Sequence, residues 1–224
     1  VLDALGVSMV EAAGAGCCGA VRFDLNEQDG AGDDARRNID AWWPSIEAGS
    51  IEAIVMTASG CGVQVKDYGH LLQHDPAYAD KATRVAELTR DIGEVVADAS
   101  EALAALLAAR NLPRQPLAWH APCTLQHGQR IRGTVEGLLA AAGFELTPVR
   151  DSHLCCGSAG TYSILQPALS ERLRTNTLDC LLAGGAGMIA SANIGCITHL
   201  QAGTGTPVRH WIELIDARLG GQHA

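Results

Sequence analysis

The sequence predicts an α/β fold built from two pseudo-repeated α/β units with mostly parallel sheets. Short apolar runs alternate with amphipathic helical stretches, which is typical of strand–helix units. A Cys-Cys-Gly motif occurs twice, and a further cysteine follows each copy at a similar interval. Because the carboxyl ends of parallel strands meet at one edge of a sheet, we expect the cysteines that follow strands to converge there.

The repeat emerges when Cys17-Cys18-Gly19 is placed over Cys155-Cys156-Gly157. Cys61 then aligns with Cys196. The interval from the Cys-Cys pair to this later cysteine differs between the two copies only by a short insertion. Each of these later cysteines follows an apolar run of β type. Such internal similarity indicates two copies of one structural unit.

The second copy has the clearest order of elements. A helix that ends at Gly143 is expected there, because glycine is the common stop after a helix. The predicted elements are a strand over 116–120, a helix over 130–142, a strand over 144–149, a helix over 167–182, a strand over 188–192 and a closing helix over 208–219.

The first copy is expected to lack its beginning. Cys123 has no counterpart, because the matching position would fall before Val1. We therefore expect a C-terminal fragment with one incomplete and one complete repeat. A strand is predicted over 51–56 and one long Ala-rich helix over 81–110. The predicted domains are a first repeat over 1–80, a helical linker over 81–112 and a second repeat over 113–224.

Composition excludes several classes of function. Lys+Arg 16 against Asp+Glu 25 gives a net charge of -9, which argues against nucleic acid or an anionic membrane bound mainly by charge. No apolar run approaches the roughly 20 residues of a membrane-spanning helix, and the start lacks the pattern of a secretory signal. With 8 cysteines and no such signal, metal binding or thiol chemistry is favoured over disulfides.

Thiolates are soft ligands that select zinc, iron–sulfur clusters or copper(I). Four of them satisfy a tetrahedral zinc ion or a four-iron cluster. The candidate metal ligands of the second repeat are Cys123, Cys155, Cys156 and Cys196. The first repeat adds Cys17, Cys18 and Cys61, and we expect this shorter set to bind metal poorly. Buried free cysteines that act as small apolar residues are the alternative.

Other residues are weaker candidates. His199 lies three residues after Cys196, but its counterpart in the first repeat is Gln64, so a ligand role is not repeated. We expect His120 and His127 to form hydrogen bonds around the site rather than to ligate metal. Cys180 is expected to be a core residue within a helix.

No catalytic or dinucleotide-binding motif is recognisable. The glycine-rich stretch over 184–187 precedes a strand, whereas a dinucleotide fingerprint follows one. A thiol nucleophile with His120 or His153 as its base stays open on the residues alone.

Longer stretches carry a resemblance to a known family. They are Met56-Thr-Ala-Ser-Gly-Cys-Gly62, Asp67-Tyr-Gly-His-Leu-Leu72, Pro122-Cys-Thr-Leu-Gln-His-Gly128, Asp151-Ser-His-Leu-Cys-Cys-Gly-Ser-Ala-Gly-Thr-Tyr162, Ala192-Asn-Ile-Gly-Cys196 and Pro207-Val-Arg-His-Trp-Ile-Glu213. The chain resembles the CCG-domain family, which includes a component of heterodisulfide reductase and the iron–sulfur subunits of several respiratory dehydrogenases. Over nearly its whole length it is similar to the C-terminal part of glycolate oxidase (glycolate dehydrogenase) iron–sulfur subunits.

The resemblance implies a non-catalytic electron-transfer subunit of a complex that oxidises glycolate to glyoxylate. It implies an iron–sulfur cluster of the 4Fe-4S type on the cysteines, and partner subunits that carry flavin (FAD) and supply the electrons. It also implies a cytoplasmic location, peripheral to the bacterial inner membrane.

The chain departs from the fullest family pattern, which ends in Cys-x-x-Cys. His199 and Gln64 occupy the places of the last cysteine. A redox cluster and a zinc-bound or metal-free module that docks the flavin subunits are therefore both kept as interpretations.

Overall fold

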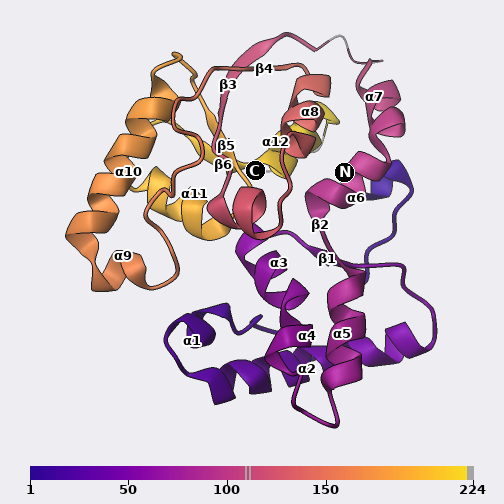
Figure 1. The fold of residues 1–224 in the computed structure, drawn as a ribbon. Helices are drawn as coiled ribbons and strands as arrows, with labels where there is room; N and C mark the ends of the chain where they lie inside the picture. The colour runs from indigo at the N-terminus through magenta and orange to yellow at the C-terminus, as the bar shows by residue number, and fades with distance from the viewer. Residues whose placement is uncertain (109, 111, 221–224) are drawn as a thin grey trace. The chain divides into compact units, whose positions relative to one another are not determined.

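The computed structural model describes residues 1–108, 110 and 112–220 (Figure 1). The chain divides into two compact units. The larger comprises Val1–Met9 with Gly93–Ala224, and the smaller comprises Val10–Ile92.

The larger unit is built on a four-stranded sheet in the order β4-β3-β5-β6, in which every pairing is parallel. The strands are β3 (Gln115–Trp119), β4 (Phe144–Leu146), β5 (Ile189–Ser191) and β6 (Val208–His210). The main helices are α8 (Thr134–Ala141), α10 (Pro167–Leu182), α11 (Ile194–Gln201) and α12 (Trp211–Arg218). Figure 1 shows α10 and α11 on one side of the strands and α8 and α12 on the other, so both faces of the sheet are covered.

Shorter helical segments complete this unit. They are η1 (Asp3–Leu5), α6 (Ile92–Asp98, whose first residue belongs to the smaller unit), α7 (Ser100–Ala108), η2 (Thr124–Gly128) and α9 (Tyr162–Leu165).

The core of the larger unit lies under the two central strands. Ala118 of β3 and Ile189 of β5 are fully buried, and Leu200 of α11 packs against them. Cys156 and Cys196 belong to the same cluster, so two of the candidate ligands lie at the border of an apolar core.

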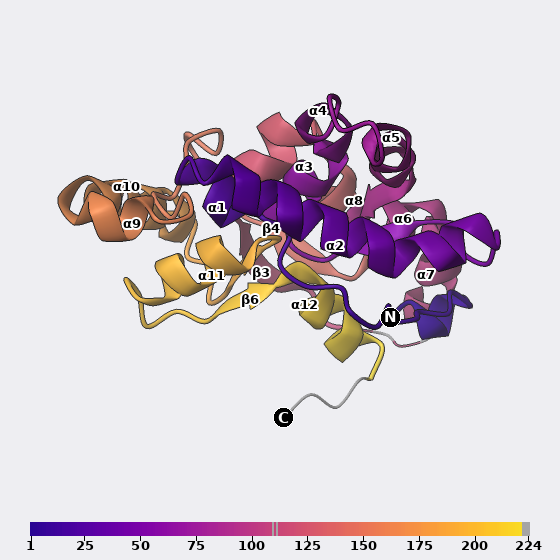
Figure 2. The same ribbon diagram turned by 90° about the horizontal axis from the view of Figure 1, so that it is seen from below.

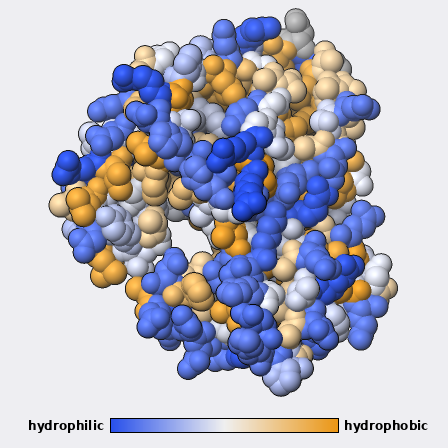
Figure 3. Space-filling model, in the orientation of Figure 1, coloured by the Kyte–Doolittle hydropathy of each residue, from blue (hydrophilic) through white to orange (hydrophobic). Residues whose placement is uncertain are grey.

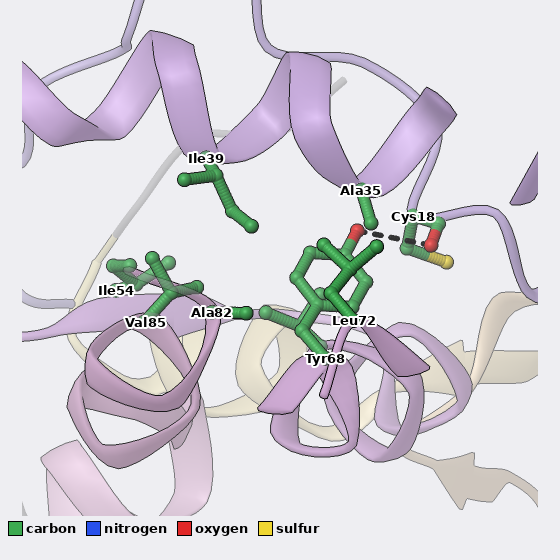
Figure 4. Close-up of a cluster of buried hydrophobic side chains, with 9 residues drawn as sticks. Cys18, Ala35, Ile39, Ile54, Tyr68, Leu72, Ala82 and Val85 are labelled. Atoms are coloured by element: carbon green, nitrogen blue, oxygen red, sulfur yellow. Dashed lines mark hydrogen bonds between the residues drawn. The ribbon is translucent and has the colours of Figure 1, made fainter. Parts of the chain in front are cut away.

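The smaller unit has a two-stranded parallel sheet of β1 (Ile54–Met56) and β2 (Thr89–Asp91). Its helices are α1 (Ala20–Asp24), α2 (Gln28–Glu47), α3 (Ser59–Lys66), α4 (Tyr68–Leu71) and α5 (Ala79–Leu88). Figure 2 shows α2 as the long helix of this unit, with α4 and α5 to one side of it. Ile39 of α2, Tyr68 of α4 and Val85 of α5 meet in its core (Figure 4).

The structure confirms the predicted α/β class with parallel sheets, and the two units share a common part. Cys61 is the third residue of α3, which follows β1, and Cys196 is the third residue of α11, which follows β5. β1 pairs in parallel with β2, as β5 pairs with β6. The smaller unit contains no counterpart of β3 or β4 within its residues, all of which the structure describes.

The prediction of one continuous helix over 81–110 is wrong, because a short strand interrupts it. Helix α5 ends at Leu88, where the Thr89 hydroxyl donates to the carbonyl oxygen of Val85 at 2.7 Å. Thr89 to Asp91 then form β2, which pairs with β1. A single short strand has no stability of its own, so this pairing is what holds the three residues in a strand. The predicted domain limits at 80 and 112 stay predictions, and residues 109 and 111 of the expected linker lie outside the described residues.

Two other expected helices start later than predicted. The helix expected over 130–142 begins at Thr134, because Gly133 has a left-handed φ of 76° that ends the preceding loop. The closing helix begins at Trp211, since Val208–His210 form β6, and the His210 ring accepts a hydrogen bond from the Ile212 N–H at its start. Within the described ranges, no helix is long and apolar enough to cross a membrane.

Tyr68→Phe tests the polar link in the core of the smaller unit. The fully buried Tyr68 hydroxyl donates to the Cys18 carbonyl oxygen at 2.9 Å and accepts from the Asn38 amide at 3.0 Å. Removing the hydroxyl leaves two buried groups short of a partner, so we expect the free energy of unfolding to fall by ~1–3 kcal/mol. Urea unfolding followed by circular dichroism measures this.

The control is Tyr162→Phe in α9, a partly exposed residue with no hydroxyl hydrogen bond to any described residue. It should change the same free energy by less than about 0.5 kcal/mol. Equal effects of the two substitutions would contradict a stabilising role for the Tyr68 hydroxyl.

Candidate metal centre

The structure brings the four candidate thiols of the second repeat together. Cys123 lies directly before η2, Cys155 and Cys156 lie in the loop after β4, and Cys196 lies in the first turn of α11. The Cys155 sulfur is in hydrogen-bond contact with the thiols of Cys123 and Cys156. Cys156 is in turn in hydrogen-bond contact with Cys196, so the four sulfurs form one connected group.

These contacts divide the thiols into two kinds. Hydrogen bonds from Cys123 and Cys156 hold the pKa of Cys155 well below its usual range. A hydrogen bond from Cys156 likewise lowers the pKa of Cys196. The donors Cys123 and Cys156 have raised pKa values, because each donates to a neighbouring sulfur and burial disfavours its charged form. The site thus stabilises thiolate, the form of cysteine that binds metal.

N–H donors point at the sulfurs of Cys155 and Cys196. The Gly157 backbone N–H donates to the Cys155 sulfur at 3.4 Å, and the Asn193 side-chain amide donates to the Cys196 sulfur at 3.5 Å. Cys196 also lies in the first turn of a helix, where the backbone dipole favours negative charge. Such contacts orient metal ligands and tune their electronic properties.

A close approach of two backbones holds the Cys-Cys-Gly loop. Gly157 has a φ of 94°, and a Cβ added there would lie 2.5 Å from the carbonyl oxygen of Ser170 in α10. The Ser170 hydroxyl donates to the Gly157 carbonyl oxygen at 2.7 Å. Gly19 repeats this arrangement, with a φ of 84° and an added Cβ 3.0 Å from the Ala31 carbonyl oxygen of α2. Both copies of the motif therefore need glycine for the same steric reason.

Two of the histidines lie around the thiols as hydrogen-bonding groups. His127 Nε2 lies 3.0 Å from the His153 carbonyl oxygen, consistent with the expected role outside the ligand set. His199 Nε2 lies 3.1 Å from the Ser170 hydroxyl, behind the loop that carries Cys155 and Cys156. The group of closely spaced donor atoms found among the described residues does not include His199.

His120 lies closer to the sulfurs than the sequence suggested. A ring nitrogen of His120 and the sulfurs of Cys156 and Cys196 all lie within 4.8 Å of one another. His120 Nδ1 lies 2.9 Å from the Ser191 hydroxyl, while Nε2 is buried and has no hydrogen-bond partner among the described residues. Burial lowers the pKa of His120 to about 4, so the ring is neutral at pH 7. Its place as the last residue of a predicted strand, three residues before Cys123, was the available signal.

The smaller unit gathers its three cysteines into a lesser version of the site. A hydrogen bond from Cys18 lowers the pKa of Cys61 to about 7, and Cys17 lies near enough to act on that thiol by its charge. Asn38 donates to the Cys17 carbonyl oxygen at 2.9 Å. Tyr68 donates to the Cys18 carbonyl oxygen (Figure 4), and the two hydrogen bonds fix the loop. No fourth cysteine occurs within Val10–Ile92, a range that the structure describes in full.

A cavity of about 310 Å³ reaches the larger thiol group. Cys155 and His120 line it together with apolar residues that include Trp119 and Leu173. Cys180 also lines this cavity and is partly exposed, so the expectation that it lies in the core is wrong. Helix α10 turns this residue toward the loop side rather than into the centre of the core, which a single cysteine within a helix does not reveal.

Large apolar side chains are exposed next to the Cys-Cys-Gly loop. They are Leu154, Ile164, Leu165, Leu169 and Ile194, with exposed fractions from 46% to 77%. In Figure 3 apolar residues gather at the edge of the molecule where Figure 1 places α9 and the start of α10. Grouped apolar exposure of this kind commonly marks a contact surface for another protein.

The sequence profile of the CCG cysteine-rich domain matches residues 1–66 and 117–201. The chain belongs to the CCG cysteine-rich domain family. All seven candidate cysteine ligands lie within the matched residues, and the two matched segments correspond to the two copies of the motif.

Several curated relatives carry names that bear on function. The glycolate oxidase iron-sulfur subunit of Escherichia coli is 52% identical over 98% of this chain and 52% of the relative. The probable glycolate oxidase iron-sulfur subunit of Bacillus subtilis is 28% identical over 84% of this chain and 41% of the relative. The chain thus spans about half the length of these relatives. Lactate utilization protein A of Bacillus subtilis is 25% identical over 97% of this chain and 90% of that protein.

Gly157→Ala tests the close approach that positions the thiols. The added methyl group would overlap the Ser170 carbonyl oxygen, so the loop must move away from α10 and carry Cys155 and Cys156 with it. We expect the affinity for zinc or cobalt(II) to fall ~10–100-fold, as when groups that orient metal ligands are lost. Competition with a chromophoric chelator measures this affinity.

The matched control is Gly185→Ala. Gly185 also has a positive φ, 73°, but an added Cβ would meet no atom within 4 Å. It should lose about 1–2 kcal/mol of stability from the left-handed backbone and keep its metal affinity. A comparable loss of affinity in both variants would show that overlap with Ser170 is not the cause.

Proposed function

We propose that this chain is the two-repeat part of an iron–sulfur subunit that transfers electrons in a complex oxidising glycolate to glyoxylate. The single observation that carries the proposal is the connected group of four thiols from three separate segments, at the carboxyl-end edge of a parallel sheet. The name of the Escherichia coli relative, at 52% identity, supports the substrate and the redox role.

The donor set suits an iron–sulfur cluster. Such clusters are held by four cysteine thiolates, and here two of the thiols already favour that form. The proposed ligands of a 4Fe-4S cluster are Cys123, Cys155, Cys156 and Cys196. The bound cluster would accept and release single electrons. The N–H groups of Gly157 and Asn193 would stabilise sulfur charge in both oxidation states, and the apolar cluster beside Cys156 would limit the access of water.

The smaller unit is proposed as a weaker site on Cys17, Cys18 and Cys61. Its three thiols fall one short of the set in the larger unit. His199 keeps only a secondary place as a candidate ligand, because its Nε2 is engaged with Ser170.

In the proposed complex, flavin subunits that carry FAD take electrons from glycolate, and this subunit passes them toward the respiratory chain. The exposed apolar side chains around Leu154 and Ile164 offer such a subunit a contact surface next to the thiols. We propose a cytoplasmic complex, peripheral to the bacterial inner membrane. The subunit itself would carry out no substrate chemistry.

A second candidate is a zinc-bound module that docks the flavin subunits without carrying electrons. The close spacing of His120, Cys156 and Cys196 favours it, because donors within 4.8 Å of one another suit a single ion. Zinc has no redox chemistry, so the two candidates differ in colour and in response to reductant.

Cys155→Ser, purified without oxygen, distinguishes these candidates. In the unsubstituted chain we expect iron with acid-labile sulfide and an EPR signal after reduction. Loss of Cys155 removes the thiolate on which two neighbouring thiols converge, so iron and sulfide should fall to background. Metal analysis, sulfide assay and EPR on the same samples measure this.

Cys180→Ser is the control, because Cys180 lines the neighbouring cavity without belonging to the connected thiol group. It should retain iron, sulfide and the EPR signal in full. Zinc without sulfide in the unsubstituted chain would instead support the docking module, and the absence of any metal would overturn both candidates.

A further inference from the structure

We infer that His120 is a direct metal ligand through Nε2, and that it binds the same metal ion as Cys156 and Cys196. This inference rests on the proposed function only in requiring that the thiols hold a metal centre. The inferred centre differs from a regular 4Fe-4S cluster on four cysteines, in which each iron binds one thiolate, because one ion here takes two thiolates and a ring nitrogen.

The first argument is distance. Metal–sulfur bonds of about 2.3 Å and metal–nitrogen bonds of about 2.0–2.1 Å keep any two donors on one ion within ~4.6 Å of each other. A ring nitrogen of His120 and the sulfurs of Cys156 and Cys196 all lie within 4.8 Å of one another. Tetrahedral angles place such donors about 3.5–3.8 Å apart. Shifts of up to about 1 Å, within the reach of side-chain rotation, would therefore bring all three onto one ion.

The second argument is the unpaired nitrogen. The His120 side chain is buried, and its Nε2 atom has no hydrogen-bond partner within the part of the chain that the structure describes. Buried polar atoms almost always have a partner, and an unsatisfied one calls for an explanation. Nε2 makes no hydrogen bond to either sulfur, although a ring nitrogen of His120 lies within 4.8 Å of both. A bound cation between the nitrogen and the sulfurs would satisfy all three groups together.

The third argument is the other ring nitrogen. His120 Nδ1 lies 2.9 Å from the hydroxyl of Ser191, which is fully buried at the end of β5. Histidine ligands usually have their second nitrogen held by a hydrogen bond, which selects the tautomer and the ring orientation. If Nε2 binds metal, Nδ1–H donates to the Ser191 oxygen. β3 and β5 are paired neighbours, so the sheet itself fixes this contact.

In one alternative, His120 binds no metal and instead donates a hydrogen bond to the centre. His120 could donate Nε2–H to a sulfur of the centre, and Nδ1 would then accept from the Ser191 hydroxyl. The neutral ring has one N–H, so the two arrangements exclude each other. They predict different magnetic and X-ray spectra of the loaded protein.

The experiment uses this chain, loaded without oxygen and labelled with ¹⁵N only in its histidine rings. If the metal is paramagnetic iron, pulsed EPR of the reduced protein should show a strongly coupled ¹⁵N nucleus, as expected for a nitrogen bonded to the metal. His120→Gln should abolish this coupling, and His127→Gln should keep it, because the His127 ring contacts a backbone carbonyl oxygen near the site. Only weak coupling in the unsubstituted protein would overturn the inference in favour of the N–H donor.

X-ray absorption at the edge of the bound metal extends the test to zinc. The ligand role of His120 is then tested even if the protein holds zinc and the proposed redox role is wrong. The unsubstituted chain should show one nitrogen neighbour per centre at a bonded distance, and His120→Cys should replace it with sulfur while metal stays bound. An unchanged neighbour shell in His120→Cys would overturn the inference. For an iron centre, this thiolate in place of a neutral ring should also lower the reduction potential.

Discussion

The Cys-Cys-Gly loop of the larger unit depends on one close approach, between the backbone of Gly157 and the first turn of α10. A side chain at Gly157 would collide with the Ser170 carbonyl oxygen, so the loop adopts this path only with glycine. The Ser170 hydroxyl then donates to Gly157 and also meets His199. A single steric constraint thus fixes Cys155 and Cys156 opposite Cys196. The same constraint recurs at Gly19 against α2, which shows that it belongs to the repeated unit rather than to one site.

The parallel sheet is the second feature that brings the site residues together. β3 leads into His120 and Cys123, and its neighbour β5 leads into Cys196. Because neighbouring parallel strands end at the same edge, these residues arrive at one place without further adjustment. The hydrogen bonds among the thiols there lower the pKa of Cys155 and of Cys196 and so favour their thiolate forms. A soft cation is the ligand that such a group of donors suits best.

The two copies have diverged around this common plan. Within the described residues, the larger unit has four strands and a connected group of four thiols, whereas the smaller has two strands and three cysteines. In the smaller unit, α4 and α5 fill the interval between α3 and β2, and Tyr68 of α4 ties the Cys17–Cys18 loop to the core. In the larger unit α11 is followed almost directly by β6. The smaller unit therefore combines a smaller group of thiols with a core to which α4 and α5 contribute.

The sequence by itself determined the repeat, the α/β class, the helix over 167–182 and the cysteines that lie in the matched family segments. These features depend on local pattern: alternation of strand and helix, glycine after a cysteine pair, and the interval to the next cysteine. The tertiary structure alone decided three others. Strand β2 interrupts a helix-like stretch because β1 provides a pairing partner from a distant segment. Cys180 reaches a cavity wall through the rotation of α10, and His120 faces Cys156 and Cys196 because β3 and β5 are neighbours. Each of these depends on contacts between residues far apart in the chain, whose packing no local pattern encodes.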